Sequence, residues 1–376
     1  MKQENLYAVA LTRLGGFNLP ALMELYQRAG SATAIYEHRN NIHDILPDAT
    51  QRLVETLENW DNVISFAERE LQYDEQNNIE VLCLNDENYP QRLRECPDAP
   101  IVLYKQGNVN LNKHRTLNII GTRNCTQYGR DLIRAFIREL KSICPDVLVF
   151  SGLAYGIDIC AHRESLANNM ETVGVVAHGL DIVYPRMHTE TAKEMCEKGG
   201  GVITEYTINT QPVPKNFVQR NRIVAGCTDA TLLVESANKG GGLITCNIAR
   251  SYNREVFAFP GAIGAEYSEG CNQLIRDNGA SLITSAYDFV KAMNWDNDIK
   301  LEKAQQQGIE RTLFPNLNSE EQTVVEALQQ QNDQQINMLS VRTNLSMARL
   351  MALLFELEMK GIIRTMAGGC YHLLEV

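Results

Sequence analysis

The stretch that decides the fold is Asn118-Ile119-Ile120-Gly121-Thr122-Arg123. Its apolar first half predicts a buried strand, and residues 124–129 have the composition of a turn. An amphipathic helix is predicted to begin at Asp131. The start of such a helix offers free backbone N–H groups to a phosphate, and Arg123 adds a planar, permanently charged donor. Taken alone, the turn also fits a tight connection with a solvated arginine, because its spacing is not that of G-x-G-x-x-G.

Three further apolar runs end in turns that contain glycine. They are 147–150 before Ser151 and Gly152, 173–176 before Ala177-His178-Gly179, and 230–235 before Lys239-Gly240-Gly241-Gly242. Strands that alternate with helical segments predict an α/β fold with a doubly wound parallel sheet. Ligands of such sheets bind outside the carboxyl ends of the strands, where all four turns are expected to lie.

Composition places the 376-residue chain among ordinary globular proteins, with 44% hydrophobic and 22% charged residues. No apolar run approaches the roughly 20 residues of a membrane span, and the first residues lack the layout of a signal peptide. The ten cysteines form no C-x-x-C pair, so we expect free thiols in a reducing cytoplasm. We expect no metal site and no cofactor.

The net charge of −11 is unevenly distributed along the chain. Residues 101–290 contain 19 Lys+Arg and 18 Asp+Glu, a net of +1, so the flanking segments together carry −12. An acidic protein can still bind a polyanion where cations gather locally on a neutral domain.

The flanks are expected to form smaller modules. Residues 1–75 predict short helices over 6–14, 19–29 and 35–37, typical of a helix-hairpin-helix or of a small helical docking domain. The central domain is placed at 76–293, and the polar stretch 294–317 is predicted to be a linker.

Residues 318–376 predict three helices and a β-hairpin, which together make a winged helix. The first helix is expected to be capped by Ser319 with Gln322, and Gly361 is expected to end the third in a left-handed conformation. Residues 316–376 contain four Lys+Arg and seven Asp+Glu. Because cations supply most of the affinity for the DNA backbone, this acidic module is expected to dock onto a protein rather than to bind duplex DNA.

The most informative central stretch is residues 212–226. Lys215, Arg220 and Arg222 could neutralise phosphates, and Phe217 offers a face for stacking a base, as in sequence-tolerant single-strand sites. The alternative is that Phe217 is a core residue and that the arginines form internal ion pairs with Glu205 or Glu235.

The ordered motifs of the centre resemble those of the bacterial DprA (Smf) family of DNA-processing proteins. The resemblance covers nearly the whole chain. The motifs are Gly121-Thr122-Arg123 with Tyr128-Gly129, the segment 151–158 with Ala161-His162, Gly179-Leu180-Asp181 with Tyr184-Pro185, Thr204-Glu205-Tyr206, Phe217 with the segment 220–223, and the segments 240–245, 257–261, 270–275 and 279–280. The chain departs from the family at two turns. The family usually has another glycine where this chain has Ala177-His178-Gly179, and serine and glycine usually alternate where it has Lys239-Gly240-Gly241-Gly242.

The resemblance implies an extended Rossmann-like domain that binds single-stranded DNA, between a helical domain like a sterile alpha motif and a winged helix. It also implies a homodimer that helps to load the recombinase RecA onto incoming strands, against single-strand-binding protein, during natural transformation. Catalytic residues are not expected. Carried over by position, the contacts to single-stranded DNA are Gly121, Thr122, Arg123, Ser151, Gly152, Lys215, Phe217, Arg220, Asn221, Gly240, Gly241 and Gly242.

A different class of function stays open. Glycine-rich turns with several carboxylates also occur in Rossmann-like hydrolases that cleave N-glycosidic bonds of nucleotides and need paired acid and base groups. Asp158, Asp181, Glu205 and Glu235 are candidates, with His162 and His178 as bases. A third alternative, a winged-helix transcription factor, is disfavoured by the acidic C-terminal module.

Overall fold

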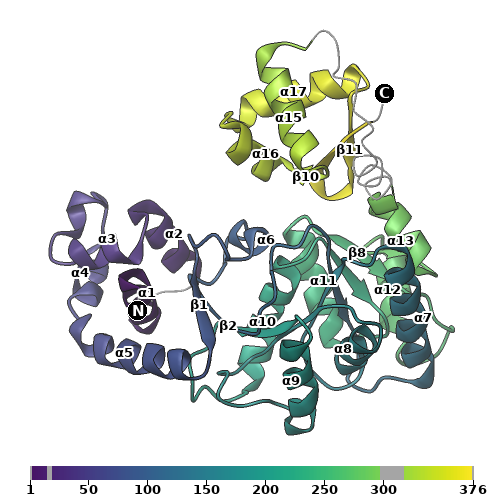
Figure 1. The fold of residues 1–376 in the computed structure, drawn as a ribbon, viewed down its shortest axis with the longest axis horizontal. Helices are drawn as coiled ribbons and strands as arrows, with labels where there is room; N and C mark the ends of the chain where they lie inside the picture. The colour runs from purple at the N-terminus through teal and green to yellow at the C-terminus, as the bar shows by residue number, and fades with distance from the viewer. Residues whose placement is uncertain (1, 15–18, 297–316, 375–376) are drawn as a thin grey trace.

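The structure is a computed structural model, and it describes residues 2–14, 19–296 and 317–374 (Figure 1). Its centre is a nine-stranded sheet with the order β1-β2-β6-β5-β4-β3-β7-β8-β9. The seven neighbouring strands β6-β5-β4-β3-β7-β8-β9 pair in parallel, whereas β2 pairs antiparallel with both β1 and β6. The strands are β1 Ile79–Cys83, β2 Val102–Gln106, β3 Thr116–Ile120, β4 Leu148–Ser151, β5 Thr172–Val175, β6 Gly201–Thr204, β7 Ala230–Leu233, β8 Glu255–Ala258 and β9 Ser281–Leu282.

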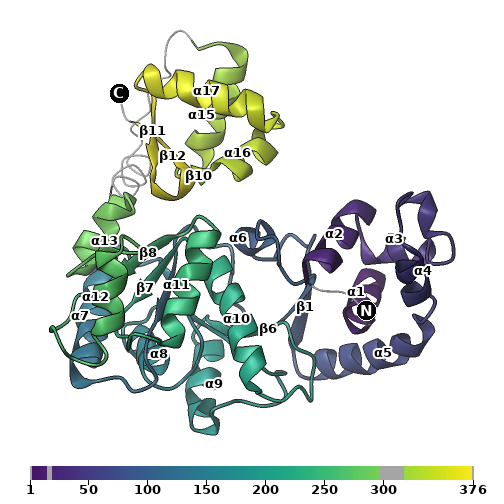
Figure 2. The same cartoon turned by 180° about the vertical axis from the view of Figure 1, so that it is seen from behind.

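Both faces of this sheet are buried under helices (Figures 1 and 2). Successive residues of the central strands enter opposite cores: Ile119 packs with α7, α8 and α13, and Ile120 packs with α10 and α11. This arrangement confirms the predicted doubly wound α/β class. The helices of this part are α6 Gln91–Arg94, α7 Gln127–Ile143, α8 Ile157–Ala167, α9 Thr189–Glu197, α10 Pro214–Gly226, α11 Gly241–Ser251, α12 Glu269–Arg276 and α13 Ala286–Ala292.

The described part of the N-terminal module, drawn in purple in Figure 1, contains five α-helices beside β1. They are α1 Gln3–Arg13, α2 Leu19–Ala29, α3 Ala32–Glu37, α4 Gln51–Leu57 and α5 Asp61–Gln76. The buried Trp60 and Tyr26 belong to the same hydrophobic core as β1 and β2. The helical module therefore packs continuously onto the antiparallel end of the sheet.

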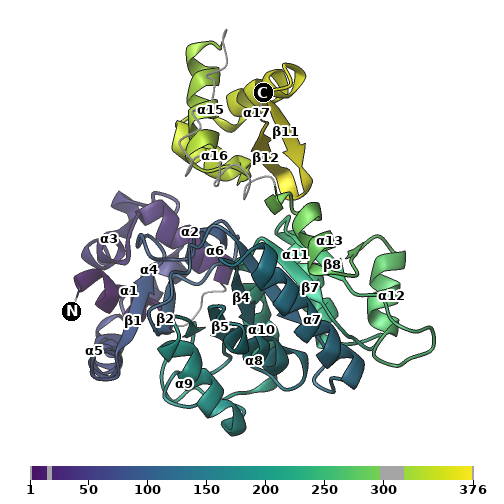
Figure 3. The same ribbon diagram turned by 45° about the vertical axis from the view of Figure 1, so that its right-hand side comes forward.

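The C-terminal module is a winged helix with its own core, and it stands on the β8 and α13 side of the sheet (Figure 3). Its elements are α15 Ser319–Gln330, β10 Gln334–Gln335, α16 Ile336–Thr343, α17 Met347–Met359, β11 Ile363–Met366 and β12 Cys370–Leu373. The predicted hairpin is present as the antiparallel pair β11–β12, and Gly361 is left-handed at φ 68°. The predicted linker over 294–317 lies mostly outside the described residues.

Two helix starts differ from the sequence prediction. Helix α7 begins at Gln127 rather than Asp131, because the side chain of Thr126 accepts a hydrogen bond from the amide of Gly129. Helix α15 is capped by Asn318 with Glu321, one residue earlier than the predicted Ser319 and Gln322. In both places a polar residue further toward the N-terminus caps the helix, so the helix begins earlier than predicted.

Candidate nucleic-acid interface

The candidate site lies where the order of strands reverses. On one side of β3, the sheet continues with β4, β5 and β6. On its other side, it continues with β7, β8 and β9, so the order of strands changes direction between β3 and β7. Such a reversal leaves a crevice at the carboxyl ends of the two neighbouring strands. Gly121 directly follows β3, and the loop that follows β7 ends at Gly240, the N-cap of α11, which begins with Gly241 and Gly242.

Glycines allow the turns at this edge to approach one another closely. A Cβ atom on Gly242 would lie 3.6 Å from the Cα atom of Gly121. Gly156, at φ 76°, leaves no room for a Cβ against the carbonyl oxygen of Thr122. The amide of Thr122 donates to the carbonyl of Glu235 at 2.8 Å, and its carbonyl accepts from Ile157 at 3.1 Å. The turn after β3 is thus held by main-chain bonds on both sides.

Cationic and aromatic side chains meet above this turn. The guanidinium carbon of the exposed Arg123 lies 5.3 Å from the ring centre of Phe217, and Tyr184 lies 5.8 Å from the same ring. Lys215 is exposed in the first turn of α10, two residues before Phe217. We call the surface formed by Thr122, Arg123, Tyr184, Lys215 and Phe217 the carboxyl-edge surface.

Phe217 is half-buried, so one part of its ring packs and another part stays accessible. An arginine over a ring gains a cation–π interaction and leaves charge beside an aromatic face. Charge for a phosphate next to a ring for a base is the arrangement of sequence-tolerant single-strand sites.

Arg220 has a different position from Arg123, because it is buried beneath the edge. Its guanidinium donates to the carbonyl of Gly152 at 2.6 Å and also to the carbonyl of Val175. Burial lowers the pKa of Arg220 to about 10, against the attraction of Asp158, so the group is still a cation at neutral pH. In this conformation Arg220 fixes the ends of β4 and β5, and its direct contact with DNA stays a prediction.

Ser151 and Gly152 are likewise engaged within the protein. The hydroxyl of the completely buried Ser151 donates to the carbonyl of Ile119 at 2.6 Å. The amide of Gly152 donates to Asp158 at 3.1 Å, and a Cβ atom there would lie 2.6 Å from the guanidinium of Arg220. These two residues shape the edge in this conformation.

The three glycines around the start of α11 differ in exposure: Gly240 is half-buried, Gly241 is exposed and Gly242 is buried. A Cβ on Gly241 would meet nothing within 4 Å. As the first two residues of α11, Gly241 and Gly242 have amides without an intrahelical acceptor. Asn221, one turn after Phe217 on α10, is half-buried.

The internal ion pair considered for Arg222 is present. Its guanidinium pairs with Glu205 in the interior, which removes Arg222 from the list of surface cations. Glu235 instead accepts from the amide and the hydroxyl of Thr126 at 2.9 and 2.5 Å. This carboxylate therefore anchors the start of α7.

Tyr184 is a member of the site that the sequence prediction missed. Its side chain is 43% exposed, and it follows β5 in the loop after Gly179-Leu180-Asp181. The available signal was its position in the loop that follows a parallel strand, because such loops lie at the ligand-binding edge of the sheet.

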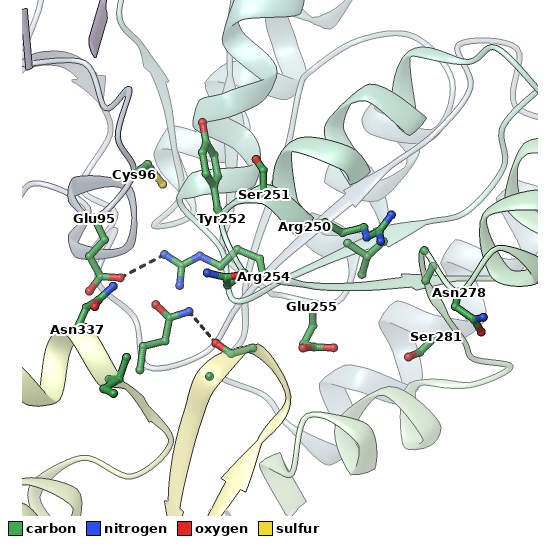
Figure 4. A pocket seen from close by; sticks show the side chains of 18 of the residues that line it. Glu95, Cys96, Arg250, Ser251, Tyr252, Arg254, Glu255, Asn278, Ser281 and Asn337 are labelled. Carbon is green, nitrogen blue, oxygen red and sulfur yellow. Dashed lines mark hydrogen bonds and ion pairs between the residues drawn. The ribbon is translucent and has the colours of Figure 1, made fainter. Parts of the chain in front are cut away.

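A cavity lies elsewhere, at the amino ends of β8 and β9 and against the winged helix (Figure 4). It measures about 940 Å³, and Arg254, Glu255, Ser281 and Gln335 are among its lining residues. Arg254 pairs with Glu95 at 3.5 Å across one wall. Since strand amino ends lie opposite the glycine turns, this cavity is separate from the carboxyl-edge surface.

Within the described residues, no helix combines the length and the apolar character that crossing a membrane requires.

Comparison with known proteins agrees with this architecture. A family model described as DNA recombination-mediator protein A matches residues 80–294, and one described as DprA winged helix domain matches residues 312–369. DNA processing protein DprA of Streptococcus pneumoniae is 36% identical over 205 residues, which are 54% of this chain and 71% of that protein. Protein Smf of Escherichia coli is 34% identical over 221 residues, 59% of this chain and 58% of that protein.

Solved structures show the same relationship. The crystal structure of the S. pneumoniae DprA matches with a TM-score of 0.65 and 29% identity, covering 77% of this chain and 98% of that one. The DprA of Helicobacter pylori, described for its single-stranded DNA binding mode, matches with a TM-score of 0.52 and 26% identity over 58% of this chain and 96% of that one. With the recombination-mediator model matching more than half of its residues, the chain belongs to the DprA (Smf) family.

Proposed function

We propose that the carboxyl-edge surface binds single-stranded DNA with little sequence preference. The observation that carries the proposal is the cluster of Arg123, Phe217 and Tyr184 at the point where the strand order reverses. Every base has a face that can stack on Phe217 or Tyr184, and Arg123 and Lys215 supply charge for the phosphates. The single-strand binding described for the H. pylori relative supports this assignment.

Main-chain donors complete the proposed site. The amide of the exposed Gly241 stands at the positive end of the α11 dipole and can donate to a phosphate oxygen, while the buried Gly242 lets α11 approach Gly121. Beneath the proposed DNA strand, Gly121, Gly152 and the buried Arg220 fix the conformation of the turns at the carboxyl edge of the sheet.

Ultraviolet crosslinking locates the bound strand. A thymidine oligonucleotide irradiated with the full chain is expected to crosslink to peptides that contain Tyr184 and Phe217. Crosslinks confined to α1–α5 or to α17 would contradict the assignment. A Phe217→Leu variant is the control, since it keeps apolar bulk but lacks the ring.

In the cell, the family membership supports a role in DNA recombination. We extend the proposal to a homodimer that loads RecA onto single strands and displaces single-strand-binding protein. The test is the rate of RecA ATP hydrolysis on a strand already coated with single-strand-binding protein. The full chain should accelerate the onset of hydrolysis, and Arg123→Ala should not; equal lag times with and without the protein would contradict the extension.

The nucleotide-hydrolase alternative finds little support in the geometry. Glu205 pairs with Arg222, Glu235 anchors α7, and Asp158 accepts from the amide of Gly152. Burial lowers the pKa of His162 to about 3, so it is neutral, and its Nδ1 lies 2.7 Å from the hydroxyl of Thr172. Release of a free base from a nucleoside monophosphate, followed by chromatography, would revive the alternative.

A further inference from the structure

Two cysteines meet directly behind the turn that carries Arg123. Cys125 lies two residues after Arg123, and Cys160 lies in the second turn of α8. The two side chains interact with each other, both pack against the core under α7, α8 and α13, and both are half-buried rather than enclosed. The Cys125 thiol donates to the carbonyl oxygen of Thr126 at 3.4 Å. They come together because the turn and the start of α8 are already joined by the bond from Ile157 to Thr122.

The surroundings of the pair favour a thiolate on Cys160. The neighbouring Cys125 thiol, followed by the cations Arg130 and Arg163, lowers the pKa of Cys160 to about 7, although burial and Glu164 oppose this. A thiolate that solvent can reach is the reactive form of cysteine. Burial instead raises the pKa of other thiols in the chain, such as Cys227 and Cys246, and leaves them enclosed.

We propose that Cys125 and Cys160 are a redox modification site, at which hydrogen peroxide converts the two thiols into a disulfide that weakens single-strand binding. The effect on binding rests on the proposed function; the formation of the disulfide does not.

The reaction balances with peroxide as the oxidant. The Cys160 thiolate attacks one peroxide oxygen, the O–O bond breaks, and hydroxide leaves, which gives a sulfenic acid. The sulfur of Cys125 then attacks the sulfenic sulfur, so that an S–S bond forms, the S–O bond breaks and a second hydroxide leaves. The hydroxides take up the two thiol protons, and two thiols with one peroxide yield a disulfide and two waters. A reducing thiol reverses the modification.

The disulfide would act on the carboxyl-edge surface through the layers of the fold. Cys125 and Cys160 pack against the core under α7, α8 and α13, whereas α10, which carries Phe217, covers the opposite face of the sheet. An S–S bond of about 2.05 Å is shorter than any contact between two thiols. Its formation draws the turn toward α8 and therefore draws Arg123 away from Phe217.

The test treats the full chain with hydrogen peroxide and then maps its peptides without reduction. The proposal predicts a linked peptide pair containing Cys125 and Cys160. It also predicts a several-fold loss of affinity for a thymidine oligonucleotide, restored by dithiothreitol. Cys125→Ser and Cys160→Ser should each bind as the reduced chain does and should not respond to peroxide. Cys196→Ser, which changes another half-buried cysteine, should respond like the unaltered chain.

Three outcomes would count against particular parts of the account. Absence of the 125–160 link after peroxide treatment overturns the modification site. A complete link with unchanged affinity overturns the coupling to the DNA surface. If the reduced chain binds no single strand at all, the proposed function fails, while the peptide map still decides whether the thiols pair.

Discussion

Arg123 is the exposed cation at the centre of the carboxyl-edge surface, and its replacement is the most direct change there. Arg123→Ala should weaken single-strand binding and reduce the salt slope by about 0.7, the value of one lost phosphate contact on a single strand. Titrations at several salt concentrations measure both quantities. Arg138→Ala, on the exposed side of α7, is the matched control. Equal slopes for Arg123→Ala and the unaltered chain would remove Arg123 from the interface.

Phe217 is predicted to stack with a base. Phe217→Ala should cost about 1–3 kcal/mol of binding free energy, because a stacked ring contributes about that much. Phe217→Trp should retain most of the affinity, since it keeps a flat aromatic face. A large fall in Tm with unchanged affinity would instead show that Phe217 is a core residue.

Asp74 makes stability depend on pH. It is buried on α5, and its carboxyl oxygens have no hydrogen-bond partner among the residues that the structure describes. Burial, with Glu70 nearby, raises its pKa to about 8. The folded chain therefore holds a proton that the unfolded chain releases near pH 3.9, and stability falls as the pH rises between these values. When the pH rises from about 5 to about 8, the free energy of unfolding of the unaltered chain should fall by at least about 1 kcal/mol more than that of Asp74→Asn, because asparagine does not titrate. Parallel pH profiles of Tm would contradict this.

Among the elements, the turn before α8 depends on one glycine. Gly156 has φ 76°, and a Cβ there would collide with the backbone of Thr122 and Arg123. Gly156→Ala should destabilise the fold by about 1–3 kcal/mol, the usual cost of a strained backbone. Gly241→Ala is the matched control: its surroundings are open and it lies in the first turn of a helix, so it should be neutral. Urea denaturation compares the two variants, and equal stability would show that the turn after β3 adapts freely.

The central strands were predictable because a parallel sheet buried on both faces needs continuous apolar runs. The helix starts were less predictable. Glu235, which binds the N-cap residue Thr126 of α7, lies 109 residues away in the sequence. The local sequence around a helix start does not reveal a partner so far away in the chain.

The candidate site was predictable at its glycine turns and less so in the roles of its side chains. Arg123 and Phe217 do lie together. An internal position for Arg220 was one of the alternatives, but the expected partners were carboxylates. Its actual acceptors could not be foreseen, because they are carbonyls 68 and 45 residues away and any residue type supplies a carbonyl. The same limit applies to Ser151, whose hydroxyl bonds to the main chain of β3.

At the scale of the whole molecule, the winged helix and the carboxyl-edge surface lie at opposite edges of the sheet. Gly368, in the turn between β11 and β12, lies beside Asn253 and Glu255 at the amino end of β8. A chain lacking residues 300–376 should therefore keep its single-strand affinity within about twofold, a change of only ~0.4 kcal/mol. Loss of binding in the truncated chain, with an unchanged Tm of the remaining domains, would assign the strand to the winged helix instead.

The most direct test of the central claim is the fluorescence anisotropy of a labelled thymidine oligonucleotide and of a matching duplex, each at low and high salt. The account predicts tight binding of the single strand that weakens with salt, weak binding of the duplex, and DNA that is recovered intact. Equal or tighter binding of the duplex, or no binding of the single strand at either salt concentration, would contradict it.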